Sequence, residues 1–508
     1  MKVLYVSCVS ATFELDNNDI YYSSKEYDVF LNGQKILSNV KTNVFSLYNL
    51  KPNSEYEVKV FDKCVTFKTN NVSEVLTTKD IVNDGSVDVT SQIQALIDNA
   101  KDDALIEISK GTYLITSLLL KSNMTLHITK DALLTCSIKE QDYKEIEGEV
   151  TLKDGSVKQV GTWEGDPKVM KLSILSGFDL KNVHIVGEGE VNGNAQLSTW
   201  WIDHKKKPYA RPHMLYLNNC ENTYVQGVHF KNSPQWTLHP YFSKNVNFFD
   251  LKITNPKISP NTDGINPQCC VGVKIIGVHF SVGDDCIALK SGKMYIGQKY
   301  KQPCEDITIR NCLMQFGHGA IVLGSEMSGG IKNLKVERCY FDHTDRGLRI
   351  KTRRGRGNTA IIDGVEFNNI YMDNVLTPLV LNMFYFCDPD GKTEYVWSKE
   401  KLPVDERTPY LGKFTFNNIK ALNCEVCAGY FYGLPEMPVE EININDSEFA
   451  FKDDAKEDTP AMMSFAEVCL RRGFVFKNVK NINLKNVKVI NQLGKEIDIE
   501  GNQKYKYE

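Results

Sequence analysis

Short segments rich in β-branched residues, each followed by a turn that contains Asn or Gly, recur from about residue 104 to residue 490. Between Val225 and Leu334, successive segments begin roughly 21 to 34 residues apart, a spacing typical of solenoid repeats. No long amphipathic helical pattern lies between them, which disfavours leucine-rich repeats and βα units. The pattern predicts an all-β fold, a parallel β-helix whose coils stack about 4.8 Å apart. The clearest segments are 225–230, 246–251, 273–278, 307–312, 334–339 and 442–447.

A separate region precedes the repeats. Residues 1–72 contain short alternating strands between turn signals such as Asn17-Asn18 and Asn32-Gly33. Leu50, Pro52 and Tyr56 match the Leu-x-Pro-x-x-x-Tyr corner of fibronectin type III domains, which this region resembles. The expected organisation is a fibronectin type III-like β-sandwich over 1–72, a linker over 73–80 and the β-helix over 81–508.

The β-helix is expected to begin with a capping helix. The apolar spacing from Ile93 to Ile97 suits a short amphipathic helix, with Thr90 or Ser91 as its N-cap. Two later stretches, 291–305 and 386–408, leave room for long loops.

Composition narrows the class of protein. Among 508 residues, 42% are hydrophobic and 24% are charged, which is ordinary for a globular chain. A net charge of −4 argues against general partners such as nucleic acid or membranes. The 14 cysteines lack a regular disulfide spacing, and one CxxC, Cys424 to Cys427, is weak support for a zinc or redox site. With no recognisable signal peptide or membrane span, reduced thiols predict a cytoplasmic protein.

Four polar motifs interrupt successive coils. They are Asn261-Thr262-Asp263-Gly264, Gly283-Asp284-Asp285-Cys286, Gly317-His318-Gly319 and Arg349-Ile350-Lys351. Equivalent positions in a solenoid stack into a column, so these motifs are expected to converge on one patch.

The strand pattern also predicts side-chain directions. Arg349 and Lys351 are two residues apart and point to one side of a strand, whereas Ile350 points inward. Asp284 and Asp285 are adjacent, so both reach the cleft only if the backbone bends, and Gly283 is expected to permit that bend.

Three carboxylates in one column suit glycoside hydrolysis. One must keep a proton for the leaving oxygen while another is ionised and activates water, and crowding of like charges can separate their pKa values. The neighbouring cations suit a substrate that carries carboxylates, because Arg can hold a carboxylate through two hydrogen bonds.

In their order and spacing, the four motifs resemble the polygalacturonase family, glycoside hydrolase family 28. Asp84-Gly85 and the segment 121–126 resemble the start of that family's β-helix, and the likeness covers most of residues 80–490. The resemblance implies a right-handed parallel β-helix that hydrolyses α-1,4-galacturonide bonds with inversion, on a galacturonate polymer or oligomer, without a metal or other cofactor.

The resemblance also implies roles for individual residues. Asp284 is the expected general acid, and Asp263 and Asp285 hold and activate the water. His318 tunes the acid. The expected substrate-binding residues are Arg349, Lys351, Asn261, Lys290 and Trp236. Retention of the Arg349-Ile350-Lys351 motif favours galacturonate over a rhamnose-containing backbone.

The mode of cutting has its own signals. The segments 163–165, 200–201, 211–213 and 233–240, together with the N-terminal domain, resemble bacterial exo-acting members. Trp200, Trp201 and Trp236 suit either sugar platforms or ordinary packing. Arg353, Arg354 and Arg356 suit either binding of a terminal uronate or a solvated basic loop.

Three other functions stay open on the residues alone. A pectate lyase can share the β-helix and use calcium, which the Asp284-Asp285 pair could bind. A non-catalytic carbohydrate-binding β-helix would leave the aspartates dispensable. A hydrolase of another uronate-containing backbone is the hardest alternative to separate.

Overall fold

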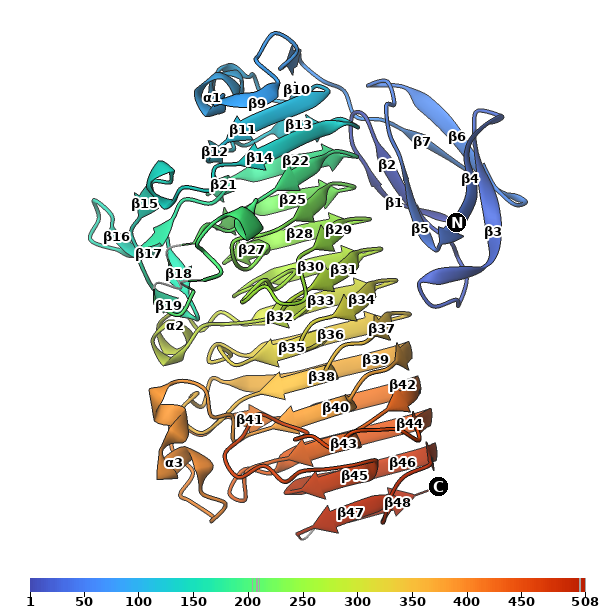
Figure 1. Cartoon of the computed structure of the whole chain (residues 1–508), viewed down its shortest axis with the longest axis vertical. Helices are drawn as coiled ribbons and strands as arrows, with labels where there is room; N and C mark the ends of the chain where they lie inside the picture. Colours follow the sequence, from blue (N-terminus) through green and yellow to red (C-terminus); the bar gives the residue numbers. More distant parts are fainter. Residues whose placement is uncertain (203, 207–208, 210, 502–503, 508) are drawn as a thin grey trace.

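The computed structural model describes residues 1–202, 204–206, 209, 211–501 and 504–507. An elongated stack of parallel strands forms most of the molecule, and a smaller β-domain lies against one side of its N-terminal half (Figure 1). The predicted all-β architecture with a parallel β-helix is confirmed.

The β-helix is built from long parallel sheets. A 24-stranded sheet runs from β8 (Val75–Thr77) and β9 (Asp84–Asp88) to β46 (Val479–Ile490) and β48 (Lys504–Tyr507). The other wall consists of two shorter parallel sheets. The first contains β12 (Leu118–Leu119), β21 (Leu175–Phe178), β24 (Leu215–Asn218) and β27 (Leu238–Tyr241). The second contains β32 (Ile287–Leu289), β35 (Ile321–Gly324), β38 (Arg346–Lys351), β40 (Thr377–Asn382), β43 (Cys427–Tyr432), β45 (Arg472–Lys477) and β47 (Ile497–Glu500).

A break in the shorter wall separates those two sheets. Ile265 makes isolated parallel bridges to Leu238 on one side and Ile287 on the other, so the column of coils continues through the break. The break therefore falls on the coil that carries the Asn261–Gly264 motif, where the backbone departs from regular strand geometry.

The core of the β-helix is apolar along its whole length. Alternate residues of each strand point inward and stack on those of neighbouring coils, as Ile275, Ile309 and Val336 do. The helix α1 (Thr90–Asn99) covers the N-terminal end with buried Ile93 and Ile97. Its N-cap residue is Val89, not Thr90 or Ser91, because the Thr90 hydroxyl instead accepts a hydrogen bond from the Thr116 N–H.

The segment expected to be a linker belongs partly to the β-helix. Within 73–80, β8 pairs in parallel with β10 (Ala104–Ile108), so its backbone groups are already part of the large sheet. The two expected long loops contain short helices, α2 (Met294–Tyr300) and α3 (Glu394–Trp397).

The N-terminal domain contains two antiparallel sheets. One consists of β1 (Lys2–Val6), β2 (Ala11–Glu14) and β5 (Val44–Leu47), and the other of β3 (Tyr22–Leu31), β4 (Gln34–Thr42), β6 (Glu55–Val60) and β7 (Lys63–Lys68). The Tyr56 hydroxyl accepts a hydrogen bond from the Lys51 N–H at 2.8 Å, which is the contact expected of a tyrosine corner. Kinship with fibronectin type III domains stays a prediction.

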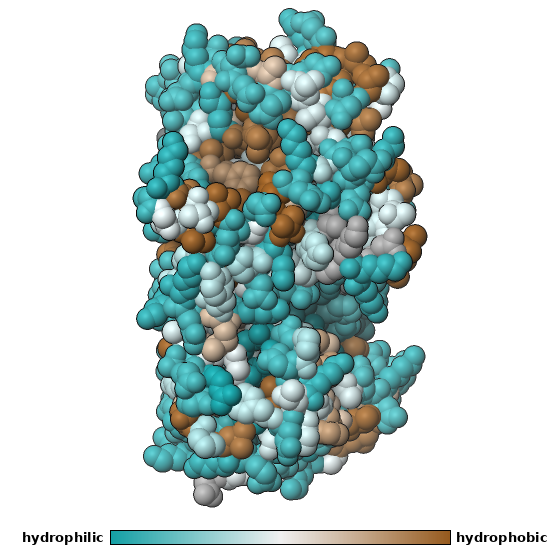
Figure 2. Space-filling model, turned by 90° about the vertical axis from the view of Figure 1, so that its left-hand side faces the viewer, coloured by the Kyte–Doolittle hydropathy of each residue, from teal (hydrophilic) through white to brown (hydrophobic). Residues whose placement is uncertain are grey.

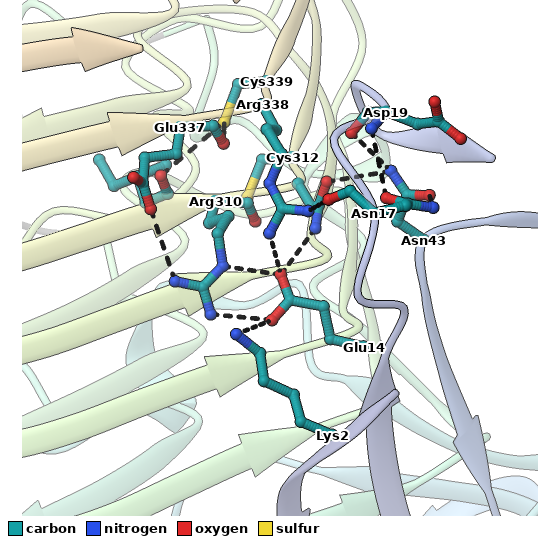
Figure 3. A network of polar contacts seen from close by, with 12 residues as sticks. Lys2, Glu14, Asn17, Asp19, Asn43, Arg310, Cys312, Glu337, Arg338 and Cys339 are labelled. Atoms are coloured by element: carbon teal, nitrogen blue, oxygen red, sulfur yellow. Dashed lines mark hydrogen bonds and ion pairs between the residues drawn. The ribbon is translucent and has the colours of Figure 1, made fainter. Parts of the chain in front are cut away.

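A charged cluster joins the two domains (Figure 3). The Glu14 side chain is fully buried and accepts hydrogen bonds from Arg310, Asn311 and Arg338 of the β-helix at 2.7–2.9 Å. An apolar contact lies beside it, in which Tyr5, Val44, Phe249 and Ile276 pack together. The domain is therefore held by both apolar packing and a buried carboxylate.

All 14 cysteines are free, and most are buried, as predicted for reduced thiols.

None of the helices in the described part of the chain combines the length and apolar character that crossing a membrane requires.

Candidate active site

A cavity of about 520 Å³ lies over the shorter wall of the β-helix, around β32, β35 and β38. Figure 2 shows the side of the molecule that carries α2 and α3, where hydrophilic residues predominate. Every site residue predicted from the sequence lines this cavity: Asn261, Asp263, Asp284, Asp285, Lys290, His318, Arg349, Lys351 and Trp236.

Backbone contacts between coils bring the motifs together. The Gly264 N–H donates to the Asp285 carbonyl at 3.0 Å, and the His318 N–H donates to the Asp284 carbonyl at 3.2 Å. Each motif therefore stacks directly on the next, and residues distant in sequence share one surface, as expected for a solenoid.

The predicted strand geometry around Arg349 is confirmed. Ile350 is fully buried in the core, whereas Arg349 and Lys351 line the cavity. Gly283 lies in a backbone bend, as expected. Its φ is not positive, and a Cβ there would lie 2.4 Å from the Ser259 carbonyl oxygen, so glycine is needed for the close approach of two coils. Both Asp284 and Asp285 nevertheless face the cavity.

Asp285 is held as a carboxylate. Lys351 donates a hydrogen bond to it at 2.8 Å and Arg349 another at 3.3 Å. Burial alone would raise the pKa of Asp285, but the charges of Lys351 and Arg349 lower it below its usual range. Asp285 is therefore the ionised member of the group.

Asp284 and Asp263 have the opposite tendency. Burial and the charge of Asp285 raise the pKa of Asp284, and burial followed by the neighbouring aspartates raises that of Asp263 well above the usual range. Asp263 also accepts a hydrogen bond from the Asn266 amide at 2.9 Å. The site thus combines carboxyls that favour protonation with one that stays ionised, as acid–base hydrolysis requires.

His318 lies near Asp284 and Asp285. Its Nδ1 is 2.9 Å from Asp345, and this hydrogen bond raises the pKa of His318 above its ordinary value. The resulting positive charge opposes the rise of the Asp284 pKa. His318 and Asp345 therefore form a charged pair at the edge of the carboxyl group cluster.

The other predicted binding residues are each positioned by a partner. Lys290 pairs with buried Glu326 at 3.0 Å and lies 4.6 Å from the centre of the Trp236 ring. Burial alone would raise the pKa of Glu326, but Lys290 holds it at about 2, so this is a buried ion pair. The Asn261 side-chain oxygen accepts a hydrogen bond from buried Arg211 at 2.9 Å.

The tryptophans divide between packing and the cavity. Trp200 is buried in the core and Trp201 packs against it, so both act in packing. Trp236 lines the cavity and stacks on Trp163, with ring centres 5.1 Å apart.

The three later arginines form neither a solvated loop nor part of the cavity lining. Arg353, Arg354 and Arg356 are buried. Arg353 and Arg356 pair with Asp388, and Arg354 pairs with Glu436. Their charges are satisfied by acidic residues of the loops after β40 and β43, which the sequence pattern does not bring near them.

Several cavity residues were not among the predicted ones: Glu164, Ser325, Glu326, Asp345, Arg346, Tyr385, Asp458, Thr459 and Met462. Arg346 begins the strand that carries the Arg349 motif and Asp345 directly precedes that strand, so their closeness in sequence to the motif was a usable signal. The sequence offers no comparable signal for Asp458 to Met462, because this segment crosses over from a distant coil. Arg346 holds it by donating hydrogen bonds to the carbonyls of Pro460 and Thr459.

Metal ligands are a separate matter. Within the described ranges, no group of three or more His, Cys, Asp or Glu side chains is arranged to hold a metal ion.

Known proteins with similar sequences indicate the family of this chain. The sequence model of Glycosyl hydrolases family 28 matches residues 121–398. A "Probable polygalacturonase" of Vitis vinifera is 33% identical over 282 residues, which are 52% of this chain and 55% of that protein. The chain spans about half the length of this and similar curated relatives.

Two solved structures share the architecture. The Yersinia enterocolitica family 28 exopolygalacturonase aligns with a TM-score of 0.70 at 19% identity, over 99% of this chain and 98% of that one. A hyperthermoactive exopolygalacturonase from Thermotoga maritima aligns with a TM-score of 0.65 at 23% identity, over 81% and 92%. These likenesses concern the fold, while the family match spans all four motifs and more than half of the chain. The chain belongs to glycosyl hydrolase family 28.

Proposed function

We propose that this protein hydrolyses α-1,4-linked galacturonic acid chains and releases short products from one chain end. The observation that carries the proposal is the carboxyl cluster. Arg349 and Lys351 hold Asp285 in its ionised form, whereas burial and the charge of Asp285 favour the protonated form of Asp284. Family membership and relatives named as polygalacturonases support it.

In the proposed reaction, Asp284 donates its proton to the glycosidic oxygen as the bond to the anomeric carbon breaks. Asp285 accepts a proton from a water whose oxygen forms the new bond on the opposite face of the sugar, which inverts the anomeric configuration. Asp263 hydrogen-bonds the same water. Its raised pKa argues against Asp263 as the main base, so we assign that role to Asp285.

Substrate charge fits the cations of the cavity. A galacturonate carboxylate would share Arg349 and Lys351 with Asp285, and Lys290 would face the neighbouring unit beside Trp236. Because seven acidic residues line the cavity, these cations are needed to bind an anionic sugar there.

Cutting from a chain end is supported by two segments outside the motif-bearing coils that also line the cavity. Glu164 comes from an insertion before β21, and Asp458, Thr459 and Met462 come from the crossing segment after β44 (Val439–Phe451). Two of the aligned structures are titled exopolygalacturonases, which agrees with this proposal.

The experiment is incubation of the purified protein with polygalacturonate in EDTA. Reducing ends, the ultraviolet absorbance of unsaturated uronate and the product ladder are followed together. Early release of monomer or dimer alone, without unsaturated product, is expected. A random ladder would reject chain-end cutting, a calcium-restored unsaturated product would indicate a lyase, and no reaction would point to another uronate polymer or to a binding role.

A further inference from the structure

A short hairpin contributes to the lining of the cavity. Its strands are β18 (Thr162–Trp163) and β19 (Asp166–Pro167), and its turn is Glu164-Gly165. Both turn residues have positive φ, 47° and 79°, which is the geometry of a type I′ turn. The turn directs the Glu164 side chain into the cavity.

The tip of this hairpin packs tightly against the β-helix. The Gly165 carbonyl accepts a hydrogen bond from the Lys293 N–H at 3.0 Å. A Cβ on Gly165 would lie 2.8 Å from both the Lys293 nitrogen and the Glu326 Cβ. No side chain fits between the tip and the wall, so a sugar chain cannot pass through this point.

Neighbouring rings support the same hairpin. Trp163 stacks on Trp236, and the Arg211 guanidinium carbon lies 5.6 Å from the centre of the Trp163 ring. The hairpin is thereby fixed relative to the base of the cavity, which holds Glu164 in place.

The Glu164 carboxyl faces the cavity without a protein partner. In the described part of the chain, it makes no hydrogen bond or ion pair, unlike Asp285 and Glu326. Burial and the nearby Glu326 raise its pKa, while Lys293 and Lys290 act in the opposite direction. As a carboxylate it can accept a hydrogen bond from a sugar hydroxyl, and as an acid it can donate one.

We infer that Glu164 is a specificity-determining residue that binds the hydroxyls of the terminal galacturonate. A chain that continues past this unit replaces a hydroxyl with a glycosidic oxygen, which has no hydrogen to donate. The next unit would also meet the hairpin tip and bring its carboxylate toward Glu164 and Glu326. This inference rests on the proposed function, because it names the group that selects the chain end.

The test compares kcat/KM on trigalacturonate for the wild type, Glu164→Leu and Glu164→Gln. Leu fills similar space without hydrogen bonding, so kcat/KM is expected to fall roughly 10- to 100-fold, mainly through KM, whereas Gln retains most activity. The matched control is Asp154→Asn. Asp154 is exposed at the turn between β16 (Glu149–Thr151) and β17 (Val157–Gln159) of the same insertion and lies outside the cavity lining.

End-modified substrates separate recognition from a merely structural effect. Trigalacturonate is supplied with a reduced reducing end, or with an unsaturated non-reducing end that lacks one hydroxyl. The wild type is expected to discriminate against one of these modifications, and Glu164→Leu is expected to lose that discrimination while its melting temperature is unchanged.

A second variant tests the closure itself. Gly165→Ala is expected to displace the tip and to add longer oligomers to the early products from polygalacturonate. An active wild type with unchanged kinetics and discrimination in Glu164→Leu would overturn the inference alone. A wild type that releases no reducing ends from any galacturonate would overturn the proposed function as well.

Discussion

The carboxyl groups of the cavity differ in what surrounds them. Asp285 contacts the charged ends of Arg349 and Lys351, whereas Asp284 faces the negative charge of Asp285. Adjacent residues of one type therefore differ in protonation because the bend at 283–286 gives them different neighbours. This difference permits one to act as acid and the other as base.

Replacing the acid is the most direct test at this scale. Asp284→Asn keeps the shape of the side chain but has no acidic proton, so kcat should fall by about 10³-fold, within the range for general acid–base catalysis. Substrate binding and the melting temperature should stay near wild type. Hydrolysis is measured by reducing ends, with exposed Asp454→Asn as control, and near-normal turnover of Asp284→Asn would reject the acid assignment.

The pH profile tests His318. Its hydrogen bond with Asp345 raises the pKa of His318, and the positive charge lowers the pKa of Asp284. In His318→Gln that charge is absent, so Asp284 should keep its proton to higher pH. The basic limb of kcat/KM should therefore move upward while the maximum falls, and a limb that stays in place would contradict the coupling.

At the scale of the coil, asparagine side chains connect successive turns. Asn182 donates to the Asn123 side-chain oxygen at 2.9 Å and accepts from Asn222 at 3.2 Å. All three have positive φ, between 54° and 56°, a conformation that Asn tolerates better than most residues. The Asn-containing turns of the sequence are thus both a backbone requirement and a ladder of hydrogen bonds along the stack.

Substitution within this ladder separates the two contributions. Asn182→Ala should lower the free energy of unfolding by about 2 kcal/mol, since it loses the hydrogen bonds and strains the left-handed turn. Asn182→Gly keeps the turn geometry, so a loss of about 1 kcal/mol is expected. Denaturant unfolding measures both, and equal losses would show that backbone conformation contributes nothing.

At the scale of the whole molecule, Glu14 links the N-terminal domain to the β-helix by contacting Arg310, which lies 296 residues later in the sequence. Burial alone would raise the pKa of Glu14, but hydrogen bonding to Arg310 and its charge, with Lys2, lower it. Neutralising it by Glu14→Gln leaves Arg310 and Arg338 short of a charged partner in a mostly buried setting (Figure 3).

We expect Glu14→Gln to weaken docking of the N-terminal domain by roughly 2 to 4 kcal/mol. Calorimetry and limited proteolysis should show earlier release of that domain. Glu26→Gln is the matched control, because the Glu26–Lys41 pair is exposed and should contribute less than about 1 kcal/mol.

The same substitution has a defined pH dependence. A lowered pKa means that the stabilisation by Glu14 is fully present above the unfolded value, about 4.3, and is lost as the pH falls through the folded pKa. The difference in unfolding free energy between wild type and Glu14→Gln should therefore shrink as the pH falls through the folded pKa of Glu14. A difference that stays constant with pH would exclude ionised Glu14 as the cause.

The sequence by itself determined the repeating coils, the separate N-terminal region and the residues of the four motifs. These features depend on local periodicity and on the stacking of equivalent positions, both of which are visible in residue spacing. Only the tertiary structure decided where the crossing segment near Met462, the Glu164 hairpin and the partners of Arg353, Arg354 and Arg356 lie. Those contacts join loops from different coils, and loop paths depend on packing against surfaces that no local pattern records.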